Sequence, residues 1–184
     1  MDGDDSYLID LNKTFQFLKE NTYRKKGYTI NKKTNKRIIS VVIVHTFGNC
    51  VNITKSIIAL FKNYNIKIIE DAAESLASYH QENNKIKHSG LLGDIGCLSF
   101  NGNKIITSGG GGCILTNNEE FAKKAKHITT TAKEPHKWDY THDMVGYNYR
   151  MPNLNAALLV AQLEQLNTFL KSKRFLAKNY ENFF

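Results

Sequence analysis

The chain has 184 residues, of which 41% are hydrophobic and 23% charged, which is typical of a single soluble globular domain with a buried core. The formal net charge is +8, but the lysines are scattered along the chain. They form no helical basic stripe, and no RNA-binding aromatic signature is present, so we expect a compositional bias and no nucleic-acid partner.

The first forty residues contain no targeting signal and one exposed segment. The start, MDGDDSYLID (1–10), is acidic and lacks the apolar run of a signal peptide, so we expect a cytoplasmic protein. No apolar run in the chain approaches the ~18 residues of a membrane span, so we expect no membrane partner. The stretch NTYRKKGYTINKKTNKRIIS (21–40) is polar and rich in turn residues, and it predicts an exposed hairpin or loop.

Strand and helix patterns then alternate, which predicts an α/β fold with a parallel or mixed sheet covered by helices. The strand patterns are IISVVIVH (38–45), IKIIED (66–71), GCLSF (96–100) and GCILT (112–116). The first two are continuous apolar runs, typical of strands buried on both faces. Asn52 or Thr54 can cap a helix in NITKSIIALFKNYN (52–65). NNEEFAKKAKHI (117–128) predicts another helix, since its acids precede its lysines.

A long apolar helix is predicted after Pro152. The sequence NLNAALLVAQLEQLNTFLKSKRF (153–175) carries apolar residues on two adjacent faces: Leu154, Ala157, Leu158 and Ala161 on one, and Leu159, Leu163, Leu166 and Leu170 on the other. So wide an apolar stripe predicts burial against a second surface, such as another subunit. The cysteines Cys50, Cys97 and Cys113 are an odd number without metal-ligand spacing, which indicates reduced residues.

Polar side chains gather where the predicted strands end. Asp71 closes IKIIED, Ser99 lies near the end of GCLSF, and Lys104 follows in a loop that ends in Gly109–Gly112. Ligands bind at this edge of open α/β sheets. A partly desolvated lysine can form a Schiff base, an acid can hold a pyridinium nitrogen, and a serine beside glycine N–H groups can bind phosphate. This set suits pyridoxal phosphate.

Each of these residues also has a simpler interpretation. A lone lysine is usually a solvated surface residue, an aspartate at a strand end is often a cap, and a glycine run is often only a turn. The Walker A pattern is absent, and no G-x-S-x-G motif supports hydrolysis by Ser99 and His45. His45 ends a strand, where we expect a structural role. The histidines lack metal-ligand spacing, so we predict no metal site.

Five segments, in order along nearly the whole chain, carry a resemblance to a known family. They are VVIVHTFGNC (41–50), IIEDAAESL (68–76), GDIGCLSFNGNKIITSGGGGCILTN (93–117), TTTAKEPHKWDYTHDMVGYNYRMPNLNAAL (129–158) and AQLEQL (161–166). The combination of E-D-A-A-E with S-F-x-x-x-K and a glycine run resembles the DegT/DnrJ/EryC1/StrS family of pyridoxal-phosphate-dependent sugar aminotransferases, and within it the LegC-type enzymes. The resemblance implies the large domain of a fold-type I pyridoxal-phosphate transferase, with three layers and a mostly parallel sheet.

The resemblance also implies a role for each site residue. Lys104 holds the cofactor as a Schiff base and later moves the proton between cofactor and substrate carbons. Asp71 pairs with the pyridine nitrogen, Glu74 lies near the phenolic oxygen of the ring, and Ser99 binds the phosphate. Asn148, in GYNYR, reaches a phosphate across a dimer interface.

The implied reaction transfers an amino group, with glutamate as the expected donor, to C4 of a nucleotide-linked 4-keto-6-deoxy sugar. Such sugars enter cell-surface polysaccharides or nonulosonic acids. The expected protein partner is a second copy of the chain or a complementary chain. Family members are about twice this length, so we expect residues 1–184 to be a partial large domain that lacks the N-terminal phosphate-loop segment and the C-terminal small domain.

Two other interpretations stay open at this point. The first is an inactive fragment or dimerisation remnant, which the apolar helix after Pro152 favours. The second is sugar dehydration, but the dehydratases of this family carry histidine where Lys104 stands, so the lysine argues against it.

Overall fold

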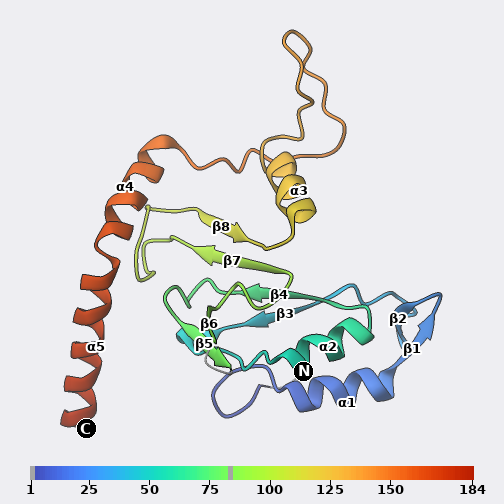
Figure 1. Ribbon diagram of the computed structural model, residues 1–184, viewed down its shortest axis with the longest axis horizontal. Coiled ribbons are helices and arrows are strands. Elements are labelled where there is room, and N and C mark those ends of the chain that lie inside the picture. The colour runs from blue at the N-terminus through green and yellow to red at the C-terminus, as the bar shows by residue number, and fades with distance from the viewer. Residues whose placement is uncertain (1–2, 83–84) are drawn as a thin grey trace. The chain divides into compact units, whose positions relative to one another are not determined.

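The computed structural model describes residues 3–82 and 85–184, and the chain divides into two compact units (Figure 1). The first unit comprises Met1–Leu98 and Ile114–Lys123, and the second comprises Ser99–Cys113 and Lys124–Phe184. Helices and a mixed sheet are both present, so the predicted α/β class is confirmed.

The main sheet has four strands in the order β3-β4-β7-β8. They are β3 (Ser40–Val44), β4 (Lys67–Asp71), β7 (Ile95–Ser99) and β8 (Gly112–Leu115). β3 and β7 both pair in parallel with β4, so that Asp71 lies opposite Val44 on one side and Cys97 on the other. β8 runs in the opposite direction to β7 (Figure 1). All four strands correspond to predicted ones, and the register places Asp71 at the carboxyl edge of the parallel strands.

Two helices form the core with one face of β3 and β4. Asp10 caps α1 (Leu11–Asn21) and Thr54 caps α2 (Lys55–Asn63), each by accepting a backbone N–H, so Thr54 and not Asn52 is the cap. The buried cluster joins these helices to both strands and to the loops beside them: Leu18, Val41, Ile43, Val51, Ile53, Phe61, Ile66, Ile68 and Leu92. Within it the rings of Phe15 and Phe61 lie 4.8 Å apart.

The other face of β3 differs from the prediction. Val41 and Ile43 are buried, but Val42 and Val44 are 53% and 44% exposed. The prediction of burial on both faces is therefore wrong for β3 in the described chain. Side chains alternate along a strand, and the core that includes α1 and α2 covers only the face that carries Val41 and Ile43.

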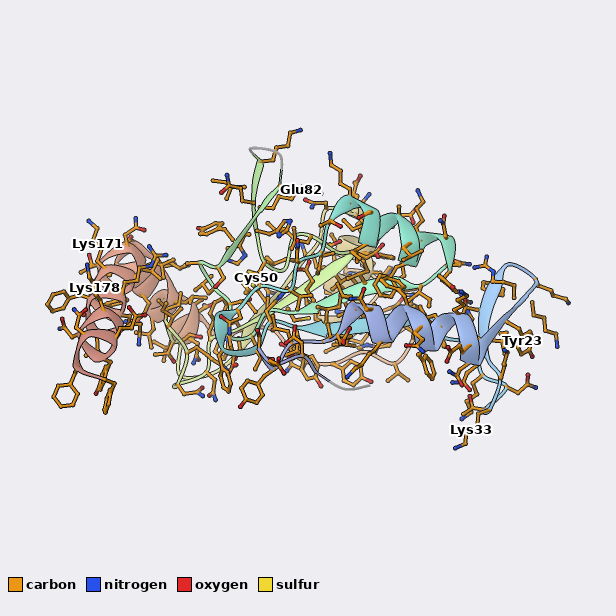
Figure 2. The ribbon with its side chains drawn as sticks, turned by 90° about the horizontal axis from the view of Figure 1, so that it is seen from below. Tyr23, Lys33, Cys50, Glu82, Lys171 and Lys178 are labelled. Atoms are coloured by element: carbon orange, nitrogen blue, oxygen red, sulfur yellow. The ribbon has the colours of Figure 1, made fainter. Side chains whose placement is uncertain are left out.

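Two hairpins extend from the first unit. β1 (Thr22–Lys25) and β2 (Tyr28–Asn31) pair across Lys26 and Gly27, which both have positive φ as a two-residue hairpin turn requires. β5 (Tyr79–Glu82) and β6 (Lys85–His88) form a second antiparallel pair that the sequence did not predict. Figure 2 labels Glu82 toward the tip of this second hairpin. A short 3-10 turn, η1 (Thr46–Gly48), follows β3.

The C-terminal helical segment belongs to the second unit. One helix was predicted over 153–175, but the structure has α4 (Asn153–Glu164) and α5 (Leu166–Phe183), interrupted at Gln165 with φ −101° and ψ 0°. Neither helix has a buried residue, and side chains such as Lys171 and Lys178 project freely from α5 (Figure 2).

Upstream, α3 (Glu119–Thr129) matches its prediction, with acids in the first turn and Lys126 in the last. The described helices are all too short or too polar to span a bilayer.

Replacing Phe61 tests the first unit's core. Because its ring is only 1% exposed and packs on Phe15, Phe61→Ala should lower the free energy of unfolding by about 3–5 kcal/mol, measured by urea denaturation. The matched control is Phe175→Ala on α5, where the ring is 69% exposed and the expected change is within about 0.5 kcal/mol. Equal losses from the two variants would contradict this core assignment.

Candidate functional site

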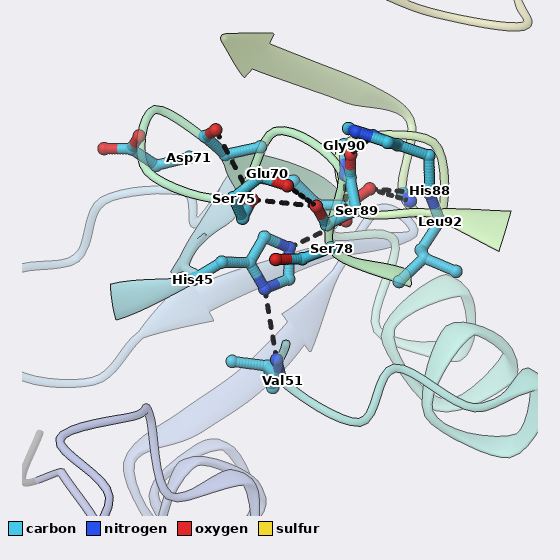
Figure 3. A network of polar contacts seen from close by, with 12 residues as sticks. His45, Val51, Glu70, Asp71, Ser75, Ser78, His88, Ser89, Gly90 and Leu92 are labelled. Atoms are coloured by element: carbon cyan, nitrogen blue, oxygen red, sulfur yellow. Dashed lines mark hydrogen bonds and ion pairs between the residues drawn. The ribbon is translucent and has the colours of Figure 1, made fainter. Parts of the chain in front are cut away.

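Asp71 is held by its own backbone and by the strands on either side. Its carbonyl accepts the N–H of His45 at 3.0 Å, and the N–H of Ala72 donates to the Cys97 carbonyl at 2.9 Å. The half-buried side chain accepts the Ala73 N–H through Oδ1 at 3.1 Å. It points away from the neighbouring Glu70 (Figure 3), since successive side chains of a strand point to opposite faces. The carboxylate is therefore fixed at the carboxyl edge of the sheet.

Glu74 lies on the next turn of chain and is tied to the loop after β3. Its Oε2 accepts the N–H of Phe47 at 2.9 Å. Phe47 has a φ of 55°, which non-glycine residues rarely adopt, and Gly48 beside it has a φ of 84°. The hydroxyl of Ser78 donates to the Gly48 carbonyl at 2.7 Å. Two hydrogen bonds thus hold the loop after β3 against the loop that follows Asp71 and carries Glu74.

Behind Asp71 lies a polar network that sequence reasoning did not single out. The carboxylate of Glu70 is fully buried and accepts four hydrogen bonds (Figure 3). They come from His45 Nε2 at 2.9 Å and from the backbone N–H groups of Gly90, Leu92 and Gly93 at 2.8, 2.7 and 2.6 Å. The available signal was an acid inside an apolar strand together with a glycine-containing segment, SGLLG (89–93).

The close approach of that segment depends on glycine. A Cβ added at Gly96 of β7 would lie 2.0 Å from the carbonyl oxygen of Gly90, a distance that no side chain tolerates. With only hydrogen at position 96, the chain at Gly90 can lie against β7 while its N–H reaches Glu70.

These donors decide the charge of Glu70. Burial alone raises the pKa of a carboxyl group, but here the hydrogen bonds from His45, Gly93 and Gly90 outweigh it and hold the pKa of Glu70 below its usual value. Glu70 is therefore an anion in the interior of the folded protein.

The loop after β4 is held by a second set of contacts. The Ser89 hydroxyl lies 2.8 Å from both the carbonyl and the hydroxyl of Ser75. His88 Nε2 accepts the N–H of Ala77 at 2.9 Å. The segment after Asp71 and Glu74 is thus tied to the residues that lead into β7.

Two cysteines near this network have thiol pKa values above the usual range. Burial, and then the negative charge of Asp71, raise the pKa of the Cys97 thiol. Burial also raises the pKa of Cys50, with a further contribution from the charge of Glu70 that a hydrogen bond with Ser89 opposes. Cys50, Cys97 and Cys113 form no disulfide in the described chain, in agreement with the expectation of reduced residues. Across residues 3–82 and 85–184, no three potential ligands gather as they would around a metal ion.

Ser99 and Lys104 belong to the second unit, in a closed loop. The N–H of Phe100 donates to the Gly111 carbonyl, and the Phe100 carbonyl accepts the N–H of Ser108, both at 3.0 Å. Phe100, Ile106 and Ser108 are buried and anchor the loop. Ser99 Oγ accepts the backbone N–H of Asn101 at 3.3 Å. Lys104 is half-buried, and its backbone N–H donates to the Asn101 carbonyl at 3.1 Å. Lys104 thus lies in a short loop whose two ends are held together by backbone hydrogen bonds.

Two amide side chains of α4 hold this loop, and sequence reasoning missed both. Asn155 Nδ2 donates to the Ser108 carbonyl at 2.5 Å, and Gln162 Oε1 accepts the N–H of Thr107 at 3.3 Å. These residues are seven positions apart, which places them on the same face two turns apart. The predicted apolar helix therefore has a polar edge that contacts the lysine loop.

Asn148, the remaining predicted site residue, is exposed in the second unit. It pairs with Thr130 in an isolated antiparallel bridge, and its neighbours Tyr147 and Tyr149 donate their N–H groups to the carbonyls of Ile128 and Thr129. The structure therefore groups Asp71 with Glu74 in the first unit, and places Ser99, Lys104 and Asn148 in the second.

Comparisons with known proteins show which family the chain is similar to. A family model described as the DegT/DnrJ/EryC1/StrS aminotransferase family matches residues 11–184. GDP-perosamine synthase of Escherichia coli O157:H7 is 38% identical over 152 residues, which are 83% of this chain and 40% of that protein. A UDP-4-amino-4,6-dideoxy-N-acetyl-beta-L-altrosamine transaminase of Campylobacter jejuni (strain 81-176) is 31% identical over 153 residues, or 83% of this chain and 39% of that protein.

A solved structure shows the same fold. The crystal structure of a DegT DnrJ EryC1 StrS aminotransferase from Brucella abortus superposes with a TM-score of 0.81 at 24% identity, covering 99% of this chain and 45% of that one. The chain thus spans less than half the length of each relative named here.

Acid should remove the stabilisation that Glu70 provides. Because the folded-state pKa is lowered, this stabilisation is complete above the unfolded pKa of about 4.5 and is lost as the pH falls through the folded-state pKa. Glu70→Gln should lower the free energy of unfolding by about 3–5 kcal/mol near pH 7, and its difference from the wild type should narrow as the pH falls below the unfolded pKa. Urea denaturation across this range measures this difference, with Glu120→Gln at an exposed position of α3 as control. If the difference in free energy of unfolding between the wild type and Glu70→Gln does not change with pH, Glu70 is not an anion.

Removing the amide of Asn155 tests the contact with the lysine loop. Asn155→Ala leaves the Ser108 carbonyl without this donor and should lower the free energy of unfolding by about 1–3 kcal/mol. It should also speed proteolysis within residues 101–111. Asn167→Ala, at an exposed position of α5, serves as the control. Unchanged proteolysis of this loop would show that α4 does not hold it.

Proposed function

The chain belongs to the DegT/DnrJ/EryC1/StrS aminotransferase family, whose cofactor is pyridoxal 5'-phosphate, and on that premise we propose that it forms the central part of the large domain of a nucleotide-sugar aminotransferase. The observation that carries the proposal is the local geometry of each group. Asp71 and Glu74 are fixed carboxylates in the first unit, and Lys104 rises from a pinned loop in the second.

The residues present fit the chemistry of this cofactor. Asp71 offers a carboxylate at the carboxyl edge of the sheet, where a pyridinium nitrogen needs an anion. Ser99 Oγ accepts the Asn101 N–H, so its own O–H remains a donor suited to a phosphate oxygen. A Cβ at Gly102 or Gly110 would meet nothing within 4 Å, so the lysine loop is uncrowded at these two positions.

The proposed roles follow from these groups. When bound, the cofactor supplies an electron sink for the carbanion that amino-group transfer requires. Lys104 Nζ would hold the cofactor through its aldehyde carbon, and its amine would move a proton between the carbon atoms that exchange the amino group. Asp71 would keep the pyridine nitrogen protonated, Glu74 would lie near the phenolic oxygen, and Ser99 would hold the phosphate.

The proposed partner is a second copy of this chain. Asn148 is exposed and would contact a phosphate bound by the other protomer. Exposed apolar residues on α4, including Leu154 at 86%, Leu158 and Leu163 at 45% each, also suit a protein interface.

The proposed substrate is a nucleotide-linked 4-keto-6-deoxy sugar, with glutamate as the amino donor. The names of the relatives support this class, since one is a GDP-perosamine synthase and another a transaminase for a UDP-linked dideoxy amino sugar. The donor loses its amino group and becomes a keto acid, and the sugar carbonyl at C4 becomes an amine. The product suits cell-surface polysaccharide or nonulosonic acid synthesis.

A second candidate function is a dimerisation remnant without cofactor turnover. The exposed apolar residues of α4 and α5 favour it, because they suit a protein interface whether or not a cofactor binds. The two candidates differ in one measurable property, which is covalent binding of the cofactor by Lys104.

Pyridoxal phosphate titration separates the two candidates. The full chain should develop a visible absorbance band, and borohydride reduction should fix one cofactor on Lys104, detectable by mass spectrometry. Lys104→Ala should abolish both signals, whereas Lys171→Ala on exposed α5 should retain them. Asp71→Asn should weaken cofactor binding by about 10- to 100-fold. A folded dimer that gives neither signal would favour the remnant.

A further inference from the structure

The hydrogen bonds from Val51 through His45 to Glu70 all have their donors on the side away from Glu70. Val51 donates its backbone N–H to His45 Nδ1 at 3.1 Å, so this ring nitrogen carries no proton. The imidazole proton is then on Nε2, which donates to Glu70 Oε2 at 2.9 Å. Both side chains are fully buried, so no water competes for these contacts. Both hydrogen bonds are therefore donated in the direction of the Glu70 carboxylate.

Two routes lead from this carboxylate to the groups proposed to hold the cofactor. The first is the backbone, because Asp71 follows Glu70 in β4 and points to the opposite face. The second runs through His45, which closes the loop from 45 to 51 by its contact with Val51. Phe47, inside that loop, donates its N–H to Glu74. Both predicted carboxylates of the first unit thus depend on one buried anion.

We propose that Glu70, acting with His45, is a positioning residue that sets the orientations of Asp71 and Glu74. That Asp71 and Glu74 bind the cofactor rests on the proposed function. That Glu70 affects the backbone N–H groups bonded to Asp71 and Glu74 does not depend on the proposed function. Glu70 lies behind the strand on the core face and contacts no reacting atom itself. Its role is to hold the loops after β3 and β4 in one arrangement.

An uncharged isostere cannot take this position. Both oxygens of Glu70 accept two hydrogen bonds each, Oε1 from Leu92 and Gly93 and Oε2 from His45 and Gly90. Glutamine would turn an NH₂ group toward one of these pairs of donors. If His45 moved its proton to Nδ1 in response, the new N–H would face the N–H of Val51. Neither histidine tautomer therefore satisfies the network around glutamine.

Amide hydrogen exchange measured by NMR on the full chain tests the link without any cofactor. The amides to follow are Phe47, which donates to Glu74, and Ala73, which donates to Asp71, since neither one contacts Glu70. Glu70→Gln should speed exchange of both by about tenfold or more, whereas Glu120→Gln, at an exposed position of α3, should leave them unchanged. Faster exchange confined to Gly90, Leu92 and Gly93 would overturn the proposal.

His45→Asn provides a second variant if Glu70→Gln does not fold. Asparagine keeps an acceptor for the Val51 N–H but loses the donor to Glu70, which retains its three backbone donors. Exchange at Phe47 should again speed up by about tenfold. An unchanged Phe47 amide in the folded variant would overturn the route through His45.

A double-mutant cycle on pyridoxal phosphate affinity links the inference to function. Glu70→Gln should weaken binding by about 10- to 100-fold in the wild-type background and much less in Asp71→Asn, because both changes act through the same carboxylate. The same loss in both backgrounds would show that Glu70 acts only on folding. If the wild-type chain binds no cofactor while the exchange results hold, the proposed function fails and the positioning role of Glu70 stands.

Discussion

An anion buried beneath a parallel sheet constrains much of the first unit. A carboxylate without water must be surrounded by donors, and Glu70 has four of them from two separate segments of the chain. These contacts fix the segment that enters β7 and the loop that leaves β3. The edge of the sheet where Asp71 lies is therefore shaped from behind by a residue that faces the core.

Local patterns in the sequence were sufficient for most of the regular structure. The four strands of the main sheet and the charge order of α3 follow from neighbouring residues, and the cap of α2 was narrowed to Asn52 or Thr54, of which Thr54 is the cap. The β5–β6 pair was missed because its residues are mostly polar and its strands lie away from the core. The break at Gln165 was missed because Gln165 and its neighbours Glu164 and Leu166 all favour a helix.

The sequence was enough to propose residues for a candidate site, but not to find the contacts that hold them in place. Asp71, Ser99 and Lys104 follow strand patterns, so position along the chain was enough to select them. Glu70 could not be distinguished from an ordinary strand-end acid, because its burial depends on donors twenty or more residues away. Asn155 and Gln162 were hidden for a similar reason, since their contacts with the lysine loop form only in the folded second unit.

The contact between Gly90 and Gly96 has a consequence for how this protein can vary over evolution. Loops at a sheet edge usually tolerate exchange of side chains, which lets a family reach new substrates. Here one such segment touches a strand so closely that even a methyl group would push them apart. Selection can therefore change the other residues of the loops at this sheet edge, but a side chain at Gly96 would collide with the backbone at Gly90.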